Sequence, residues 1–148
     1  MVERAIRGLD LDALVRAREK RRMTRADLAR LTGLSTSTIQ KWESGATSPN
    51  IETLAKAAAA LGVPMRRIIK VPTKRRTLAD WRRLSGLSRT KLARAAGLTT
   101  PALAALERGE SQLTDEKADR IAPHLKATHA QLHAAWQRAR ERPPGTPA

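Results

Sequence analysis

The strongest constraint on the fold is an internal repeat, in which residues 64 positions apart are similar over a continuous stretch without a gap. The pair Leu28-Ala29 aligns with Leu92-Ala93, and Glu43 aligns with Glu107. Each copy is about one small domain long, a size that can just fold by itself. The repeat therefore predicts two similar small domains in tandem and leaves no room for a large enzyme core.

Within each copy the apolar residues recur every three or four positions, as at Leu78, Trp81 and Leu84, and strand-like alternation is absent. Gly33 and Gly97 stand where a helix is expected to end and the backbone to turn left-handed. Residues suited to cap a helix N-terminus recur along both copies: Asp10 or Asp12, Thr24, Ser35, Asn50, Thr77, Ser88, Thr99, Thr114 and Thr128. This pattern predicts an all-α protein with five short helices in each copy.

The segments between and after the copies have the composition of connectors. Residues 70–77 contain Pro72 and a basic run, and residues 138–148 contain three prolines. We expect a first domain in residues 1–70, a basic linker in 71–76, a second domain in 77–137 and a disordered tail in 138–148. The basic run either follows a phosphate backbone or is simply solvated: Lys74, Arg75 and Arg76.

The net charge indicates the kind of partner. The chain carries 29 lysines and arginines against 14 aspartates and glutamates, a formal charge of +15 on 148 residues. Residues 1–70 have 14 basic and 7 acidic side chains, and residues 71–148 have 15 and 7. Such a charge suits a polyanion, of which nucleic acid is the leading candidate, although a compositional bias toward arginine and alanine also produces basic surfaces.

The sequence lacks the residues and motifs that several other classes of function require. There is no cysteine for disulfides or thiolate metal sites, and no segment resembles a signal peptide or a membrane span. Glycine-rich phosphate loops, nucleophile elbows and paired carboxylates are also missing. His129 and His133 are four residues apart, but a solvated helix face explains them better than a metal ion. We expect a cytoplasmic, non-enzymatic protein without a cofactor, metal or membrane partner.

One segment of the first copy has a distinctive set of motifs. It begins with a threonine cap at Thr24 and continues with the Leu28-Ala29 pair, a Gly-Leu-Ser turn at 33–35, an aliphatic Ile39 and a closing Glu-x-Gly at 43–45. This segment resembles the helix-turn-helix of the xenobiotic-response-element and Cro family, to which the lambdoid phage repressors belong. The resemblance covers nearly all of residues 11–69 and, more loosely, residues 77–136. It implies two tandem five-helix lambda-repressor-like domains that bind double-stranded DNA.

In proteins of this type the second helix crosses the DNA backbone and the third enters the major groove. The third helix of the first copy has an inward side with Ile39 and Trp42 and a polar outer side. Short hydroxyls and one long cation suit base-edge acceptors and thymine methyls in that groove. The resemblance assigns base reading to Thr36, Ser37, Thr38 and Lys41, whereas it turns Gln40 toward a phosphate or solvent.

Phosphate contacts are expected at the start of the second helix and in the loop after the third. Backbone N–H groups, hydroxyls and guanidinium groups at a positive helix end suit an anion, although Thr24 and Asn50 can also serve only as caps. The expected phosphate contacts in the first copy, besides Gln40, are Thr24, Arg25, Ser44, Thr47, Ser48 and Asn50. Those in the linker and second copy are Arg75, Arg76, Ser88, Arg89, Lys91 and Thr100.

Two further sets of residues are expected to support the fold rather than touch bases. The resemblance implies an ion pair between Arg18 and Glu43, repeated by Arg82 and Glu107, that orients each third helix. The helical period places the three tryptophans in the cores: Trp42, Trp81 and Trp136.

The third helix of the second copy has lost most of its polar side chains. Ser37, Thr38, Gln40 and Lys41 are replaced by Pro101, Ala102, Ala104 and Ala105. Three interpretations remain open. In the first, the alanines contact thymine methyls while Arg89, Lys91 and Arg94 hold phosphates. In the second, the face around Ala102, Leu103 and Ala105 binds a second chain or another protein. In the third, the copy is a passive remnant.

These observations predict a sequence-specific transcriptional regulator, most simply a repressor of the phage immunity type, whose first domain reads bases. The alternative is a protein-interaction or antitoxin-type regulator that uses its second domain to dimerise or to bind a partner. A third class, sequence-blind packaging of DNA, predicts affinity that is uniform over sequence and falls steeply with salt.

Overall fold

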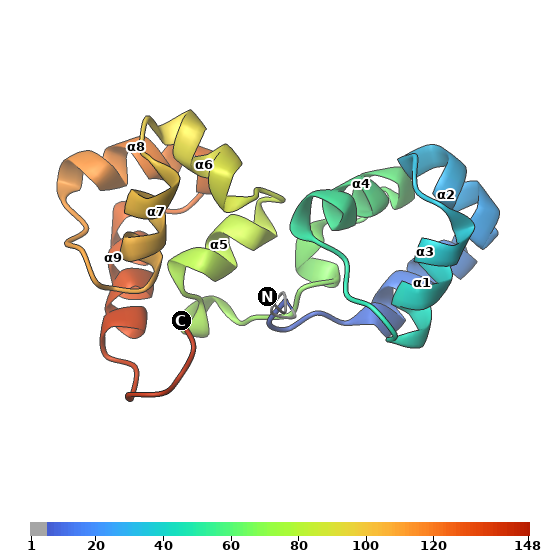
Figure 1. The fold of residues 1–148 in the computed structure, drawn as a ribbon, viewed down its shortest axis with the longest axis horizontal. Coiled ribbons are helices and arrows are strands. Elements are labelled where there is room, and N and C mark those ends of the chain that lie inside the picture. Colours follow the sequence, from blue (N-terminus) through green and yellow to red (C-terminus); the bar gives the residue numbers. More distant parts are fainter. Residues whose placement is uncertain (1–5) are drawn as a thin grey trace. The chain divides into compact units, whose positions relative to one another are not determined.

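The computed structural model describes residues 6–148, and in that range the chain forms helices but no strand. It divides into two compact units at residue 70 (Figure 1). Unit 1, which ends at Lys70, consists of α1 (Leu11–Lys20), α2 (Arg25–Thr32), α3 (Thr36–Ser44), α4 (Ile51–Leu61) and the 3₁₀ turn η1 (Met65–Arg67). Unit 2 begins at Val71 and consists of the 3₁₀ turn η2 (Thr73–Arg75), α5 (Leu78–Leu84), α6 (Arg89–Ala96), α7 (Thr100–Glu107), α8 (Asp115–Leu125) and α9 (His129–Arg140).

The predicted helix starts are confirmed, with Asp10 rather than Asp12 as the first cap. Each cap side chain accepts a hydrogen bond from the backbone N–H three residues on, and Thr24, Thr77 and Thr128 complete reciprocal capping boxes. The left-handed turn at the end of the second helix of each copy is also confirmed, because Gly33 and Gly97 have φ values of 74° and 69°. Local side-chain chemistry thus sets where these helices begin.

The fifth helix is the element in which the two copies differ. Unit 2 has the predicted fifth helix, α9, but unit 1 has only the single turn η1, so the prediction of five helices is wrong for the first copy. After η1 the chain pairs with the N-terminal arm instead: the N–H of Asp10 donates to the carbonyl of Ile68 at 2.7 Å, and Leu9 and Ile69 form an isolated antiparallel bridge. These backbone hydrogen bonds replace helical ones and close unit 1.

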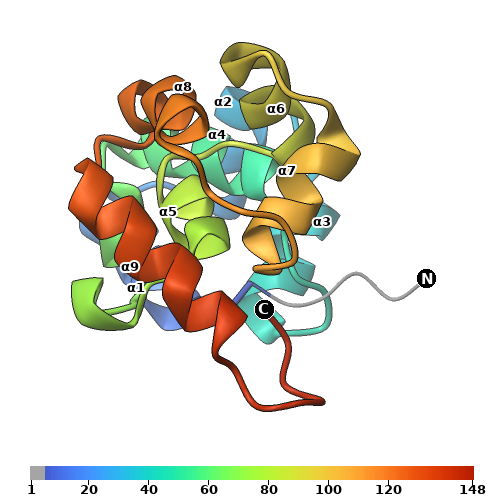
Figure 2. The same ribbon diagram turned by 90° about the vertical axis from the view of Figure 1, so that its left-hand side faces the viewer.

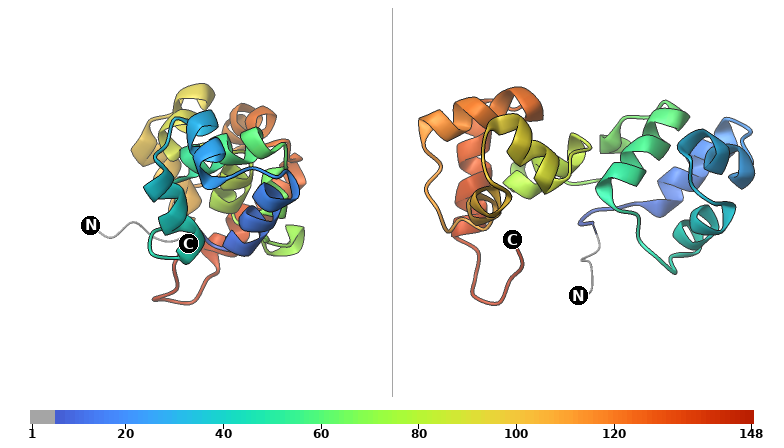
Figure 3. Two further views of the ribbon diagram at one scale, coloured as in Figure 1. Left: turned by 90° about the vertical axis from the view of Figure 1, so that its right-hand side faces the viewer. Right: turned by 45° about the horizontal axis from the view of Figure 1, so that its top comes forward.

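Each unit has its own core. In unit 1, Leu14, Leu28 and Leu54 are almost completely buried. Figure 3 shows the backbone of this unit from two further sides. In unit 2, Leu92 and Leu132 belong to one buried cluster contributed by all five helices. The prediction that the three tryptophans lie in the cores is confirmed, since each is less than one tenth exposed: Trp42, Trp81 and Trp136.

Two details of the chain's connectors differ from expectation. Val71 is buried, and Arg76 donates from Nε to the carbonyl of Val71 while its guanidinium lies over the ring of Trp81 at 4.6 Å. The linker is therefore folded into unit 2 rather than freely exposed. The expected tail is also shorter, because α9 continues to Arg140 with Ala139 in the core, and the chain then turns back beside the helix (Figure 2).

Candidate nucleic-acid interface

The turn between α2 and α3 is built by three adjacent residues. Gly33 ends α2 in the left-handed region, the N–H of Leu34 donates to the carbonyl of Ala29 at 3.0 Å, and Ser35 caps α3. Ala29 and Ile39 are buried against the core, which fixes the angle between the two helices. This arrangement is a helix-turn-helix, and it leaves one side of α3 exposed.

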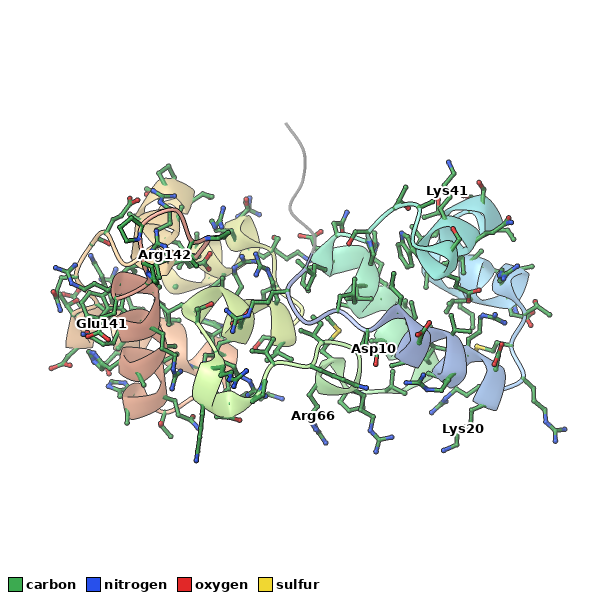
Figure 4. All side chains as sticks on the ribbon, turned by 90° about the horizontal axis from the view of Figure 1, so that it is seen from below. Asp10, Lys20, Lys41, Arg66, Glu141 and Arg142 are labelled. Carbon is green, nitrogen blue, oxygen red and sulfur yellow. The ribbon has the colours of Figure 1, made fainter. Side chains whose placement is uncertain are left out.

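The residues predicted to read bases lie on this exposed side of α3. Thr36, Ser37 and Lys41 are exposed, and Lys41 points away from the body of unit 1 (Figure 4). Thr38 is half-buried, and its hydroxyl is hydrogen-bonded to that of Ser35 at 2.8 Å. Gln40 is exposed as well. The exposed side of α3 is therefore rich in hydroxyl groups and carries one lysine, Lys41. Among the predicted base-reading side chains, that of Thr38 is the least free to move, because it is half-buried and hydrogen-bonded.

The residues predicted to contact phosphate in unit 1 flank this surface, and two of them also cap helices. Thr24 caps α2 by accepting from the N–H of Asp27, and Asn50 caps α4 by accepting from the N–H of Thr53. The Ser44 hydroxyl donates to the carbonyl of Lys41. The remaining loop residues are exposed: Thr47 and Ser48. Capping accounts for Thr24 and Asn50, and phosphate contact by any of these residues remains a prediction.

A buried carboxylate ties together α1, α2 and α3. Arg18 donates from Nε to Oε1 of Glu43 at 2.6 Å and from Nη1 to the carbonyl of Met23 at 2.8 Å, as the resemblance implied. Arg25 is a third member that was expected only to contact phosphate, and its Nε donates to Oε2 of Glu43 at 2.6 Å. Burial raises the pKa of Glu43, but the hydrogen bonds from both arginines outweigh it, so the pKa lies below 4.5.

Unit 2 repeats this three-membered cluster. Arg82 donates from Nε to Oε2 of Glu107 at 2.7 Å, and Arg89 donates to Oε1 at 3.0 Å. Arg82 also donates to the carbonyl of Leu87, as Arg18 does to that of Met23. Arg89 stands at the repeat position of Arg25, and this correspondence was the signal in the sequence for a third member. The third helix of each copy, α3 and α7, is thus anchored by the same ion-pair geometry.

The outer side of α7 is smaller and less apolar than expected. Leu103 was included in a bare face with Ala102 and Ala105, but it is 1% exposed and belongs to the core, because it occupies the position of Ile39. Ala104 is also buried. Only Pro101 is exposed along this stretch, with Ala102 and Ala105 half-buried. Among the described residues the one large hydrophobic side chain that is strongly exposed lies elsewhere, on α2: Leu31.

The basic candidates of unit 2 lie mainly on α6. Lys91 and Arg94 are exposed, and Arg89 is 42% exposed although it is paired with Glu107. Ser88 caps α6 and Thr100 is half-buried in the first turn of α7. The linker candidates are Arg75 and Arg76. Arg75 is exposed, whereas the guanidinium of Arg76 contacts the ring of Trp81 and the carbonyl of Val71.

The two histidines of α9 face carboxylates that the sequence analysis did not connect with them. His129 Nε2 lies 2.9 Å from Oδ1 of Asp119, and His133 Nε2 lies 3.6 Å from Oδ1 of Asp115. The described part of the chain contains no group of three or more residues placed to hold a metal ion. Nor does it contain a helix long and apolar enough to cross a membrane.

The fold and this site define an all-α protein with two tandem helix-turn-helix units. A family model described as helix-turn-helix, of the Cro/C1 type, matches residues 14–68 and again residues 78–132. The chain therefore belongs to this helix-turn-helix family, as its resemblance to the phage repressors indicated, and it is a DNA-binding regulator of transcription. Proteins of the family are typically not enzymes. No curated protein and no solved structure matches the chain.

Proposed function

We propose that the chain is a sequence-specific repressor of the phage immunity type, in which α3 reads bases and unit 2 adds contacts to phosphate. The observation that carries this proposal is the contrast between α3 and α7. Both helices are anchored by the same arginine–glutamate cluster, but α3 exposes hydroxyls and Lys41 where α7 exposes Pro101. Discrimination between sequences is therefore assigned to unit 1.

The charge of unit 2 supports its role as a phosphate-binding unit. Residues 71–148 contain 15 basic and 7 acidic side chains, and α6 exposes Lys91 in its first turn and Arg94 in its last turn. Phosphate contacts hold a protein on the duplex without carrying sequence information directly. A cation-rich unit tethered to a base-reading unit raises affinity for the site that the other unit selects.

Repression is the simplest regulatory consequence of this division. Occupying a promoter is sufficient to exclude a polymerase, and it requires only a long-lived complex on a defined site. A protein with this task acts where the DNA is, and the proposal therefore includes the cytoplasm as its compartment.

The proposal is tested by selecting bound duplexes from a random library at physiological salt. We expect a defined motif, because α3 presents side chains that suit base edges. The Lys41→Ala variant is expected to change the preferred sequence at one position, whereas Lys91→Ala lowers affinity for all sequences together and reduces the salt slope by about one. Enrichment of no motif by the unaltered protein would overturn sequence-specific regulation and favour sequence-blind packaging.

A second candidate is favoured by the half-buried alanines of α7. A protein partner or a second copy of the chain could pack on Pro101, Ala102 and Ala105. The Ala105→Glu variant would then lose the partner or the dimer while it keeps the sequence preference of unit 1. Sedimentation of both proteins, with and without the selected duplex, distinguishes this candidate from phosphate binding by unit 2.

A further inference from the structure

Unit 1 has a second basic surface at the end of α1, on the side opposite the reading helix. The guanidinium of Arg21 lies over the C-cap of α4, where a Cβ on Gly62 would stand 2.7 Å from Nη2. The turn η1 begins three residues after Gly62, so Arg21 lies beside the segment that leads to Arg66 and Arg67. Figure 4 shows Lys20 and Arg66 pointing to the same side of unit 1, away from Lys41.

These four cations are exposed and have little acidic compensation. In the described range, none of them forms an ion pair with a carboxylate. The acidic residue next to them in the chain is Glu19, which is also exposed, and Asp10 is already paired with Lys70 and Arg16. We call the four cations the α1–η1 surface: Lys20, Arg21, Arg66 and Arg67.

Unit 2 lacks this charge, on α5 and on α9, the helix that stands where unit 1 has η1. The positions of its repeat that correspond to the α1–η1 surface are uncharged: Leu84, Ser85, Ala130 and Gln131. Neighbouring like charges repel one another and oppose folding. A cluster of like charges without carboxylate partners is therefore better explained by a ligand of opposite charge than by stability.

We propose that the α1–η1 surface binds the phosphate backbone of a second DNA segment, so that one chain can bridge two duplexes. The inference goes beyond base reading by α3, but its ligand rests on the proposed function of unit 1. Three of the four cations are arginines, and guanidinium groups match phosphate oxygens in a bidentate manner. Duplex DNA offers closely spaced phosphates without demanding a shaped pocket, which suits an open surface. A duplex seated on α3 lies on the opposite side of unit 1 and leaves this surface accessible.

The test uses the full-length chain and the duplex selected by it. One duplex is immobilised on beads, and a second, fluorescently labelled duplex is added with the protein, while the affinity for a single duplex is measured separately. The test variant is Lys20→Gln/Arg66→Gln/Arg67→Gln, which keeps Arg21 because its guanidinium covers the C-cap of α4. The control, Lys56→Gln/Lys126→Gln, removes two exposed cations from other places.

We expect the test variant to retain about tenfold less of the labelled duplex than the unaltered protein, while its affinity for a single duplex changes less than about threefold. The control variant should retain most of the bridging. Undiminished bridging by the test variant would overturn the proposal and favour an acidic protein as ligand. An equal loss of bridging and of single-duplex affinity would overturn it as well, because the surface would then touch the same duplex as α3.

These outcomes are separate from a failure of the proposed function. If the unaltered protein binds no selected duplex, base reading by unit 1 is refuted, and bridging can be measured with non-specific duplexes at low salt. If the protein binds the selected duplex but retains no second one, only the bridging inference is refuted.

Discussion

Gly109 and Arg140 lie so close that a Cβ on Gly109 would stand 2.6 Å from both the backbone nitrogen and the Cα of Arg140. Gly109 also has a φ of 72°, a region that side chains rarely adopt. Further hydrogen bonds hold the loop after α7 against α9: Trp136 Nε1 donates to the carbonyl of Ser111, and Arg140 Nη1 to that of Gly109. The last turns of α9 therefore hold the loop that follows α7 in place.

This contact predicts that Gly109→Ala destabilises unit 2 much more than Gly45→Ala destabilises unit 1. Gly45 has the same backbone conformation, with φ of 77°, but no atom lies within 4 Å of its Cβ position. We expect about 1 kcal/mol for Gly45→Ala from the left-handed backbone alone. For Gly109→Ala we expect about 3 kcal/mol or more, because the backbone of α9 must also shift.

Amide hydrogen exchange resolved by residue measures the two units separately within the full chain. Equal losses of protection for the two substitutions would contradict the close contact between the turn at Gly109 and the backbone of α9. A loss confined to unit 2 in the Gly109→Ala variant is the expected result.

The difference between these two glycines shows what the sequence could not reveal. The repeat aligns Gly45 with Gly109, and both were predictable as turn residues. The collision with Arg140 depends on α9, which unit 1 replaces with η1 and a backbone bridge to its N-terminal arm. Contacts between distant segments are invisible to a local pattern, whereas caps such as Ser35 depend on residues three positions apart and were predicted correctly.

The lowered pKa of Glu43 predicts an acid-dependent loss of stability in unit 1. A carboxylate whose folded-state pKa is below its unfolded value stabilises the fold above the unfolded pKa, near 4.5, and loses this contribution as the pH falls through the folded-state pKa. Glu43→Gln should therefore lower stability at neutral pH and reduce the dependence of unit 1 stability on pH below about 4.5.

Asp10 provides the matched comparison for this titration. Its pKa is also lowered, chiefly by the hydrogen bond from Lys70, but its side chain is 27% exposed, against 5% for that of Glu43. Asp10→Asn is expected to change the pH dependence less than Glu43→Gln, because salt and water screen the Lys70 pair. Denaturation at several pH values measures both variants, and an unchanged acid transition in Glu43→Gln would contradict the assignment.

Two basic residues adopt a left-handed backbone at positions where the other copy has glycine. Lys126, with φ of 52°, corresponds to Gly62, and Arg22, with φ of 54°, corresponds to Gly86. Lys126→Gly should stabilise unit 2 by up to about 1 kcal/mol, because the backbone strain that glycine relieves in the folded state exceeds the cost of its greater freedom in the unfolded chain. Thermal denaturation checks the sign, and destabilisation would mean that the Lys126 side chain makes a stabilising contact.

The site was less predictable than the fold for a related reason. The polar pattern of α3 correctly placed Thr36, Ser37 and Lys41 on an exposed side. The same helical period suggested that Ala104 would be exposed like Gln40, yet it is buried. Arg25 was expected to contact phosphate alone, because its distance to Glu43 depends on how α2 packs against α3. Exposure and pairing at the site are set by the packing of helices, which the sequence pattern does not contain.

The two arginines that share Glu43 are expected to differ sharply when each is removed. The side chain of Arg18 is 11% exposed, so Arg18→Ala leaves the Glu43 carboxylate without its buried partner and should destabilise unit 1 by about 3 kcal/mol. The side chain of Arg25 is 47% exposed, and Arg25→Ala should cost at most about 1 kcal/mol. If Arg25 also contacts phosphate, its loss lowers affinity for every duplex and reduces the salt slope, because the contact carries no sequence information. Binding to the selected duplex and to a scrambled one, over a series of salt concentrations, measures this effect. An unchanged salt slope would leave Arg25 with the structural role that it has beside Glu43.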